Sequence, residues 1–431
     1  MNAPLKIGHV FVPGGQPIYT YNPRKSSSLE ERLEDYLDAP YKILSLTGST
    51  KSGKTVLARK ILPKEEAIWV SGGQIESSDN LWSKILDSSN SFNHITQTKA
   101  DSKSVSDSRK FDASAKVMNL GGGLATAHTN RDTHSSQESV SRITNPIFTA
   151  TNFLIDSKIP LVIDDFHYID PDTQLQIIRS LKDCVFEGVP VLIIAVPHRA
   201  YDAVRVEKEM TGRVQQLQIP PWQPDDLSQI AGLGFDVLDI DIAKPIIDNL
   251  ILESFASPHI VQEFCLSICR INKVRRQSSS KENKQIIQAP ADWNKFFRNK
   301  ANEMGRKEFE RLARGPRQRS DRKVRYFENG EEGDIYKAVL YAISKVGAKD
   351  KLEYEEVRAG LKDVLASEIP KSQEIGRVLE KMSEIAREHI EGEPVLDWDK
   401  EYSTLYLSDP FFAYYLKWGA YIPSSSDKRF T

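Results

Sequence analysis

One stretch of eight residues constrains the fold of this chain more than any other part of it. Residues 48–55 read GSTKSGKT and satisfy the pattern G-x-x-x-x-G-K-[ST]. A short apolar run at 42–46 comes before this stretch, and residues 56–61 follow it with helical spacing. Between a strand and a helix, such a loop turns its backbone N–H groups around phosphate oxygens at the positive end of the helix. The sequence therefore predicts a strand, a phosphate-binding loop and a helix of an α/β fold.

Two side chains in this stretch suit a nucleotide bound together with magnesium. The ammonium group of Lys54 can reach the β and γ phosphates, and the hydroxyl of Thr55 can ligate Mg²⁺. We therefore expect ATP and Mg²⁺ as cofactors. The loop residues expected to contact them are Gly48, Ser49, Thr50, Lys51, Ser52, Gly53, Lys54, Thr55 and Val56.

A second predicted strand ends in acid. Residues 161–163 are apolar and are followed by Asp164 and Asp165. Asp164 is expected to hold the magnesium through water, and Asp165 to orient or deprotonate the attacking water. Adjacent carboxylates can also cap a helix, but together with the phosphate-binding loop they favour a site for ATP hydrolysis. Lys54 and Asp165 are therefore predicted catalytic residues.

Arginines near two later apolar runs are further catalytic candidates. The run at 189–196 is followed by His198 and Arg199, and Arg213 stands just before the run at 216–219. A polar side chain at the carboxyl end of a parallel strand can contact the γ phosphate, with Arg199 as first choice and His198 as second. Arg213 is predicted to lie at the rim of the sheet and to reach the ATP of a neighbouring subunit. Each arginine can alternatively be a member of a surface ion pair.

The apolar runs of the first half alternate with helical patterns. They lie at 42–46, 67–70, 159–164, 189–196 and 216–219. Continuously apolar strands separated by helices indicate a parallel sheet covered on both faces. The predicted fold class is therefore α/β, with the parallel sheet of a P-loop NTPase.

Two stretches interrupt this pattern. Residues 96–144 are rich in Ser, Thr, Asp and Gly, and the alternation around the glycines at 121–123 favours a β-hairpin insertion, with a disordered loop as the alternative. Residues 295–325 hold twelve basic and four acidic residues, a local charge of +8. Such a basic connector either contacts nucleic acid or is a solvated linker.

The C-terminal part has three helical patterns followed by two short strands. The helical patterns lie at 335–346, 357–365 and 375–385, and the strands at 394–398 and 404–407. Three helices followed by a hairpin are the layout of a winged helix-turn-helix.

The bulk composition indicates the compartment. The chain of 431 residues has 58 Lys and Arg against 60 Asp and Glu, a formal charge of -2, so it has no bulk attraction for nucleic acid or acidic lipid. Its three cysteines lack zinc-like spacing and are typical of reduced thiols in a cytoplasmic protein. The first residues lack the features of a signal peptide, and no apolar run approaches the ~20 residues of a membrane span. We expect a soluble, cytoplasmic protein with no membrane partner.

These motifs resemble those of AAA+-like STAND ATPases, close to the archaeal STAND group and the origin-initiator ATPases. The resemblance covers residues 15–270 and 330–420, and its specific parts are GSTKSGKT, LVIDDFHYID and AVPHR. It implies that Pro258 and His259 contact the nucleotide from a helical lid, although a serine stands where this element of the family has glycine. It also implies that Arg24 grips the adenine side of the nucleotide, with a plain β-turn as the alternative.

The resemblance also implies an order of domains. The sequence DPFFAYYL at 409–416 is similar to an element that follows the winged helix in archaeal STAND proteins, where aromatic side chains are expected to pack the wing onto the body. The predicted domains are a P-loop ATPase domain at 1–220, a helical lid at 221–290, a basic connector at 291–330 and a winged-helix domain at 331–431.

For function, the resemblance implies an ATP-driven molecular switch that oligomerises and signals to a separate effector protein, with bacterial antiviral defence as its setting. The alternative is a DNA-binding AAA+ ATPase, similar to replication initiators or transposition regulators, that grips duplex DNA. The helix predicted to read DNA has Arg377, Lys381 and Arg387 offset by three glutamates, which favours protein contacts. A scaffold that binds ATP without turnover is a third hypothesis, and the intact hydrolysis residues argue against it.

Overall fold

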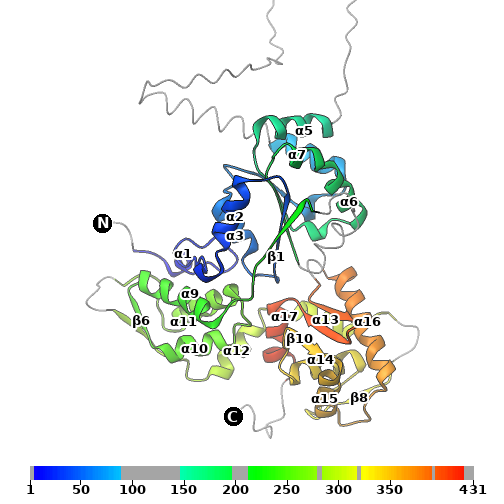
Figure 1. Cartoon of the computed structure of the whole chain (residues 1–431). Helices are drawn as coiled ribbons and strands as arrows, with labels where there is room; N and C mark the ends of the chain where they lie inside the picture. The colour runs from blue at the N-terminus through cyan, green and yellow to red at the C-terminus, as the bar shows by residue number, and fades with distance from the viewer. Residues whose placement is uncertain are drawn as a thin grey trace, which may run out of the picture.

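The computed structural model describes residues 4–88, 146–196, 212–278, 284–317, 322–390 and 394–421. The predicted insertion at 96–144 lies outside them, as do His198 and Arg199. Figure 1 shows three groups of elements: a sheet with its helices, a helical group that includes α9 to α11, and a C-terminal group around α14 to α16.

A parallel sheet of five strands forms the centre of the first group. The strand order is β2-β3-β4-β1-β5, and all neighbouring strands are parallel. The strands are β1 (Ile43–Thr47), β2 (Ile68–Ser71), β3 (Leu161–Asp164), β4 (Val191–Ala195) and β5 (Val214–Gln218). Strands β1 and β4 are buried along their whole length, as continuously apolar sequences predict. The predicted parallel sheet is confirmed.

Helices cover both faces of this sheet (Figure 1). Because successive strand residues point to opposite faces, Leu44 and Leu46 of β1 pack against α2 and α3, whereas Ile43 packs in a second core with Trp82. The helices of the second core are α5 to α7 and the helical residues 78–88. The bounds are α2 (Leu29–Asp38), α3 (Lys54–Ile61), α5 (Pro146–Ser157), α6 (Pro171–Ser180) and α7 (Lys182–Phe186), with short 3-10 helices η1 (Lys25–Ser27), η2 (Gly72–Gln74) and η3 (Phe166–Tyr168).

The helical group is joined by the start of the chain. It consists of α9 (Pro224–Val237), α10 (Lys244–Leu252), α11 (Pro258–Ile271) and the parallel strands β6 (Ile240–Ile242) and β7 (Gln285–Ile287). The N-terminal helix α1 (Ile7–Val10) packs here, and the ring of Phe11 lies 5.1 Å from that of Phe235. A Cβ at Gly234 would lie 2.2 Å from the Phe11 ring, so only glycine leaves room for this aromatic contact.

The basic stretch at 295–325 contains two packed helices. These are α12 (Trp293–Ala301) and α13 (Arg306–Arg314). Their apolar sides are buried in the core, with Phe297 on the first helix and Leu312 on the second. Exposed basic residues such as Lys295 and Lys307 occupy the solvent side. Most of the local charge therefore lies on the outer surface of folded helices.

The three helices and two strands predicted for the C-terminal part are present, together with a third strand. Strand β10 completes an antiparallel sheet in the order β10-β12-β11. The elements are α14 (Ile335–Lys345), β10 (Lys351–Glu353), α15 (Tyr354–Val364), α16 (Ser372–His389), β11 (Leu396–Asp399) and β12 (Thr404–Leu407), preceded by the hairpin β8 (Arg325–Tyr326) and β9 (Glu332–Gly333).

The predicted aromatic element at 409–416 packs onto the body of the molecule. It forms α17 (Pro410–Tyr415), which continues into the π-helix η5 (Leu416–Ala420). The hydroxyl of Tyr414 donates to the carbonyl oxygen of Phe297 at 2.9 Å, and the indole of Trp418 donates to Glu253 at 2.7 Å. This element therefore joins the C-terminal group to α10 and α12.

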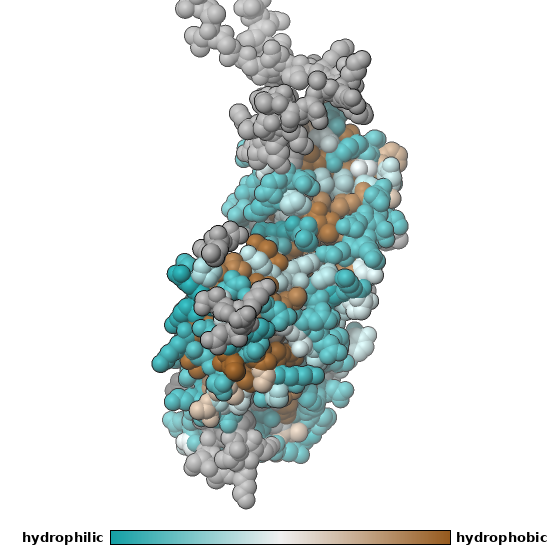
Figure 2. All heavy atoms as spheres, turned by 90° about the vertical axis from the view of Figure 1, so that its left-hand side faces the viewer, coloured by the Kyte–Doolittle hydropathy of each residue, from teal (hydrophilic) through white to brown (hydrophobic). Residues whose placement is uncertain are grey.

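The surface in Figure 2 carries mostly polar side chains, with apolar side chains gathered in smaller areas between them. Among the described residues, no helix combines the length and the apolar character needed to cross a membrane. The three cysteines are buried and form no disulfide.

Candidate functional site

The loop at 48–55 connects β1 to α3, as predicted. Its backbone is left-handed at Gly53, with a φ of +94°, a conformation that glycine adopts readily. A Cβ at Gly48 would lie 3.1 Å from the Cβ of Ile219. The side chain of Lys54 is buried, and its Nζ donates to the carbonyl oxygens of Gly48 and of the next residue, at 2.9 Å each. The loop is therefore wrapped closely around this ammonium group.

The predicted metal-binding side chains lie together. The hydroxyl of Thr55 donates to Oδ1 of Asp164 at 3.1 Å, and Asp165 follows at the end of β3. Burial raises the pKa of the Asp164 carboxyl, and burial followed by the charge of Asp164 raises the pKa of Asp165. A hard divalent cation with oxygen ligands would relieve this crowding of negative charge. The arrangement fits the predicted magnesium site.

Gly72 is a part of the site that the sequence analysis did not identify. Asp165 has a φ of 55°, a left-handed conformation that few non-glycine residues adopt. A Cβ at Gly72 would lie 2.2 Å from the carbonyl oxygen of Asp165. Only glycine therefore fits beside this turn, and its sequence signal was a glycine directly after an apolar strand.

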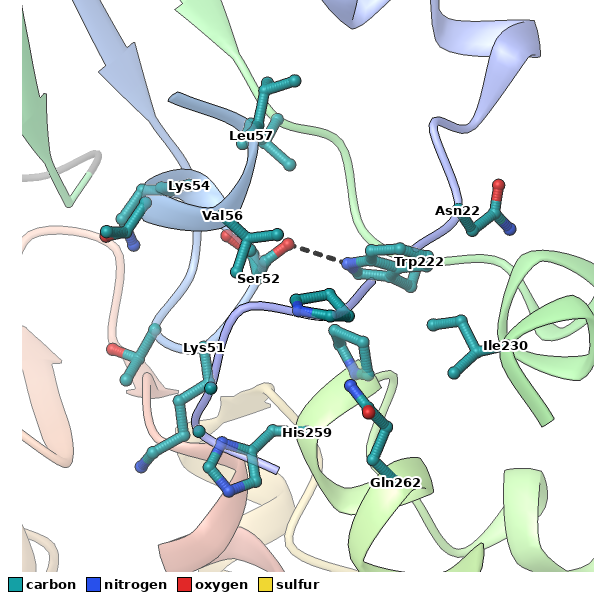
Figure 3. Close-up of a pocket in the computed structure, with 18 of the residues that line it drawn as sticks. Asn22, Lys51, Ser52, Lys54, Val56, Leu57, Trp222, Ile230, His259 and Gln262 are labelled. Carbon is teal, nitrogen blue, oxygen red and sulfur yellow. Dashed lines mark hydrogen bonds between the residues drawn. The ribbon is translucent and has the colours of Figure 1, made fainter. Parts of the chain in front are cut away.

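A cavity of about 500 Å³ lies beside the loop (Figure 3). Its volume is within the range of ~300–1,000 Å³ that small-molecule sites occupy. Its lining includes the loop and Asp165, the N-terminal segment with Arg24, the link with Trp222, Pro258 and His259 of α11, and the C-terminal residue Asp409. The sequence-predicted residues from the lid and the N-terminal segment are thus brought to the loop.

Arg24 and Trp222 form one end of the cavity. The Arg24 guanidinium lies 4.3 Å from the centre of the Trp222 ring and donates to the carbonyl oxygen of Pro220 at 2.8 Å. Burial lowers the pKa of this guanidinium from its usual value. The indole of Trp222 donates to the carbonyl oxygen of Ser52 at 2.8 Å (Figure 3). Trp222, which the sequence analysis missed because it lies in a Pro-rich link, thus joins the lid side to the loop.

The helical group, which is the predicted lid, contributes His259 at the start of α11. The side chain of Ser257 accepts from the backbone N–H of Ile260 at 3.4 Å, so the serine at the family's glycine position caps this helix. Burial lowers the pKa of His259 to about 4, and the charge of Lys51 adds to this shift while Asp409 opposes it. At neutral pH the imidazole is therefore uncharged. His259 lines the cavity as a neutral side chain.

The loop is also in contact with the C-terminal element. Nζ of Lys51 lies 2.5 Å from Oδ2 of Asp409 and 3.8 Å from the centre of the Phe411 ring. The ring of Phe411 in turn makes an edge contact with His259, at 4.8 Å between ring centres. Loop, lid and C-terminal element therefore meet at four side chains, which we call the junction.

Arg213 is not among the residues that line the cavity. It lies just before β5, where its carbonyl oxygen accepts from the N–H of Ile43 at 2.8 Å. Its side chain is partly exposed. Its predicted role at a neighbouring subunit remains a prediction, as does the role of Arg199, which lies outside the described residues.

Strand order and site together define the class of fold. The phosphate-binding loop follows β1, the acidic pair follows β3, and β4 lies between these two strands. Both features lie at the carboxyl edge of one parallel sheet, which is the arrangement of a P-loop NTPase. The chain has this fold.

Comparisons with known proteins find similarity only among solved structures. No protein-family model and no curated protein matches the sequence. The chain is similar to Cdc6p from Pyrobaculum aerophilum, with 13% identity, 96% of this chain and 98% of that chain covered, and a TM-score of 0.42. It is also similar to the Orc1 protein of Aeropyrum pernix, solved in complex with DNA, with 12% identity, 96% of this chain and 97% of that chain covered, and a TM-score of 0.42. A STAND protein with a tetratricopeptide repeat sensor from Pyrococcus horikoshii is 13% identical, with 94% of this chain and 44% of that chain covered and a TM-score of 0.33. Scores this low carry no functional information.

Proposed function

We propose that this chain is an ATP-binding and ATP-hydrolysing molecular switch that oligomerises and signals to a partner protein. The junction is the observation that carries this proposal, because it places Lys51 of the phosphate-binding loop against Asp409 of the C-terminal element. A nucleotide bound to the loop changes the surroundings of Lys51. Since a ligand shifts a conformation only through its different affinities for the two states, this contact gives ATP and ADP a route to the C-terminal domain.

The proposed hydrolysis uses the residues gathered at the carboxyl edge of the sheet. Thr55 and, through water, Asp164 would hold Mg²⁺, which would supply positive charge to the phosphoryl oxygens. Lys54 binds the β and γ phosphates, and Asp165 orients the attacking water and accepts its proton. The raised pKa of Asp165 suits this role, because a general base works best when its pKa is closer to the working pH.

The proposed output is a winged helix formed by α14, α15, α16 and the sheet β10-β12-β11. Ion pairs neutralise charges of the later part of α16 and of the β11-β12 hairpin. They are Lys381 with Glu384, Arg387 with Asp397 and Lys400 with Glu380. A near-neutral surface supports a protein partner over the major groove of DNA, whose readers present free basic or amide side chains. A separate effector protein, a cytoplasmic location and a role in bacterial antiviral defence belong to the same proposal and come from the family resemblance.

The junction gives the switch a direct test. The side chain of Asp409 also accepts from the N–H groups of Phe411 and Phe412 at the start of α17, and asparagine is as good a helix cap as aspartate. Asp409→Asn should therefore keep the fold and lose the charge opposite Lys51. Charge-assisted hydrogen bonds contribute about 1.5–3 kcal/mol, so the restraint of the junction on the C-terminal domain should weaken by this amount. ATP-dependent assembly, measured by light scattering, is therefore expected at an ATP concentration about tenfold lower than in the wild type.

The matched control for this variant is Asp399→Asn, which removes a charge from a turn of the same domain while keeping an acceptor for the N–H groups of Glu401 and Tyr402. Unchanged assembly in the control and a lower ATP midpoint in Asp409→Asn support the switch. Identical midpoints in both variants and the wild type would show that the junction does not restrain the C-terminal domain.

The proposed role of Arg213 depends on subunit association. An arginine supplied to a neighbouring ATP contributes about 10³ to 10⁵ to the rate. Arg213→Ala should therefore lower turnover by about 10³-fold at protein concentrations where the wild type assembles, and change it little in dilute monomer. A defect of equal size at every concentration would rule out action in trans.

The experiment that separates the main proposal from DNA binding is the molar mass of the Asp165→Ala protein with Mg-ATP, measured by light scattering with and without duplex DNA. A large assembly that needs ATP but no DNA supports the switch. A monomer that assembles only when duplex DNA is added would favour the alternative, a DNA-binding ATPase.

A further inference from the structure

A second cavity, of about 450 Å³, lies in the C-terminal domain at the start of α16. It is far from the phosphate-binding loop in sequence and shares no lining residue with the first cavity. Its polar walls come from β8 and α16, which lie in the C-terminal group of Figure 1. Its charged lining residues are Arg322, Lys323, Arg325, Lys371, Arg377 and Glu374. Five positive charges and one negative charge line the recess, and two further acids, Asp334 and Glu368, pair with Arg322 and Lys323, which leaves a net charge of +2.

Two of these arginines are held in place by neighbouring groups. Arg325 is only 4% exposed, and its Nη2 donates to Glu374 at 2.7 Å while its Nη1 donates to the carbonyl oxygen of Glu368 at 3.1 Å. Arg322 pairs with Asp334 and lies 4.6 Å from the centre of the Tyr336 ring. In both arginines Nε is buried and has no hydrogen-bond partner within the described residues. These Nε atoms are inaccessible from the recess, and the Nη groups already have partners, so both arginines act on a ligand there through their charge.

The other cations of the recess are poorly compensated. Lys323 has a distant partner, Glu368, at 3.8 Å. In the part of the chain that the structure describes, the exposed side chains of Lys371 and Arg377 have no ion-pair partner. Lys371 is also the N-cap of α16: its carbonyl oxygen accepts from the N–H groups of Glu374 and Ile375, but its side chain offers no acceptor to the first turn. A cation at the positive end of a helix is unfavourable. An anion bound there would be attracted both by the helix end and by the Lys371 ammonium group.

We propose that this recess binds the phosphate group of a small phosphorylated ligand, such as a phosphomonoester or a nucleotide. Arginine forks bind phosphate oxygens through paired, charge-assisted bonds, and a helix N-terminus adds backbone donors. The volume is that of a small-molecule site, and its lining includes one buried cation, Arg325, and one half-buried cation, Arg322. Duplex DNA would instead need a row of free cations that continues beyond the recess, and along the rest of α16 the cations are paired with acids. The site is independent of the proposed ATPase function.

The test uses the full-length Lys54→Ala protein, in which the first cavity is disabled, and inorganic pyrophosphate and AMP as probes. Saturable binding of at least one probe is expected by calorimetry. Adding Arg377→Ala or Lys371→Ala should weaken it about tenfold each, the effect of one charge-assisted bond. Lys381→Ala, which removes a cation of the same helix that is paired with Glu384 outside the recess, should leave the affinity unchanged. Glu374→Gln should strengthen binding, because it removes the negative charge from the lining and keeps an acceptor for Arg325.

A merely structural role for these residues predicts a different pattern. The midpoint of thermal unfolding of each variant shows whether its fold is lost. A loss of fold would weaken binding, so it cannot explain stronger binding by Glu374→Gln. No saturable binding of either probe, or the same affinity in all variants, overturns the proposal. Duplex DNA is the third probe: if it binds in a manner that depends on Lys371 and Arg377 while pyrophosphate and AMP do not bind, the recess contacts a nucleic-acid backbone and the proposal is wrong.

Discussion

The Asp165→Ala protein is expected to bind Mg-ATP with nearly the affinity of the wild type and to hydrolyse it about 10² to 10⁴ times more slowly, the usual contribution of a general base. Asp164, Thr55 and Lys54 remain in this variant, so the groups proposed to hold the metal and the phosphates are kept. Single-turnover release of phosphate measures the chemical step, and calorimetry measures the binding. Equal hydrolysis by this variant and the wild type would remove Asp165 from the reaction.

The backbone at Asp165 makes the choice of variants important. Its φ of 55° costs about 1–2 kcal/mol for an alanine, whereas asparagine tolerates this conformation and keeps the shape of the side chain. Asp165→Asn should therefore be as inactive as Asp165→Ala and more stable. Asp172→Ala, which removes an exposed carboxylate from the first turn of α6, should retain full activity.

The pH dependence follows from the same carboxylate. Burial and the charge of Asp164 raise the pKa of Asp165, and the form that accepts a proton is the carboxylate. The rate should therefore fall as the pH falls through this raised pKa, at a higher pH than for an ordinary aspartate. Asp165→Asn should lose this limb of the pH profile along with its activity.

Lys54→Ala is the second variant with a large expected effect. It removes the cation proposed to bind the β and γ phosphates, and because each charge-assisted bond contributes about 1.5–3 kcal/mol, ATP affinity should fall by about 10² or more. The carbonyl oxygens of Gly48 and Ser49 also lose their donor, so the free energy of unfolding should fall by about 1–3 kcal/mol. Calorimetry with Mg-ATP and denaturant unfolding measure the two effects separately.

Lys54→Arg distinguishes these two effects. It keeps the charge and the donors to the loop carbonyls, so it should recover much of the stability while recovering less of the affinity, because the planar guanidinium does not fit a loop wrapped around an ammonium group. ATP binding by Lys54→Ala at the wild-type affinity would mean that the nucleotide does not lie on this loop.

Features confined to short stretches of sequence were predictable. Three features each depend on a few neighbouring residues: the phosphate-binding loop, the strands on either side of β4, and the pair Asp164 and Asp165. Their apolar runs and motif spacing can be recognised in the sequence without knowledge of the fold. The three C-terminal helices were predictable for the same reason, because each keeps helical apolar spacing over several turns.

Features that depend on contacts between distant residues were not predictable. Gly72 matters only because β2 runs beside β3, which brings it against the carbonyl of Asp165. Trp222 acquires its role when a proline-rich link passes over the loop. Strand β10 has only three residues and depends on pairing with β12. The helices α12 and α13 were concealed by their charge, because their basic residues dominate the composition while a few large apolar residues determine the packing.

The first cavity is assembled from opposite ends of the chain. Val12 bonds to Gln262 across 250 positions, and Lys51 bonds to Asp409 across 358. A nascent chain therefore cannot complete this cavity until residue 409 has been made, long after the loop at 48–55. A ligand at a hundred times its dissociation constant adds about 2.7 kcal/mol to the folded state. A nucleotide in this cavity would therefore stabilise together segments that are hundreds of residues apart in the sequence.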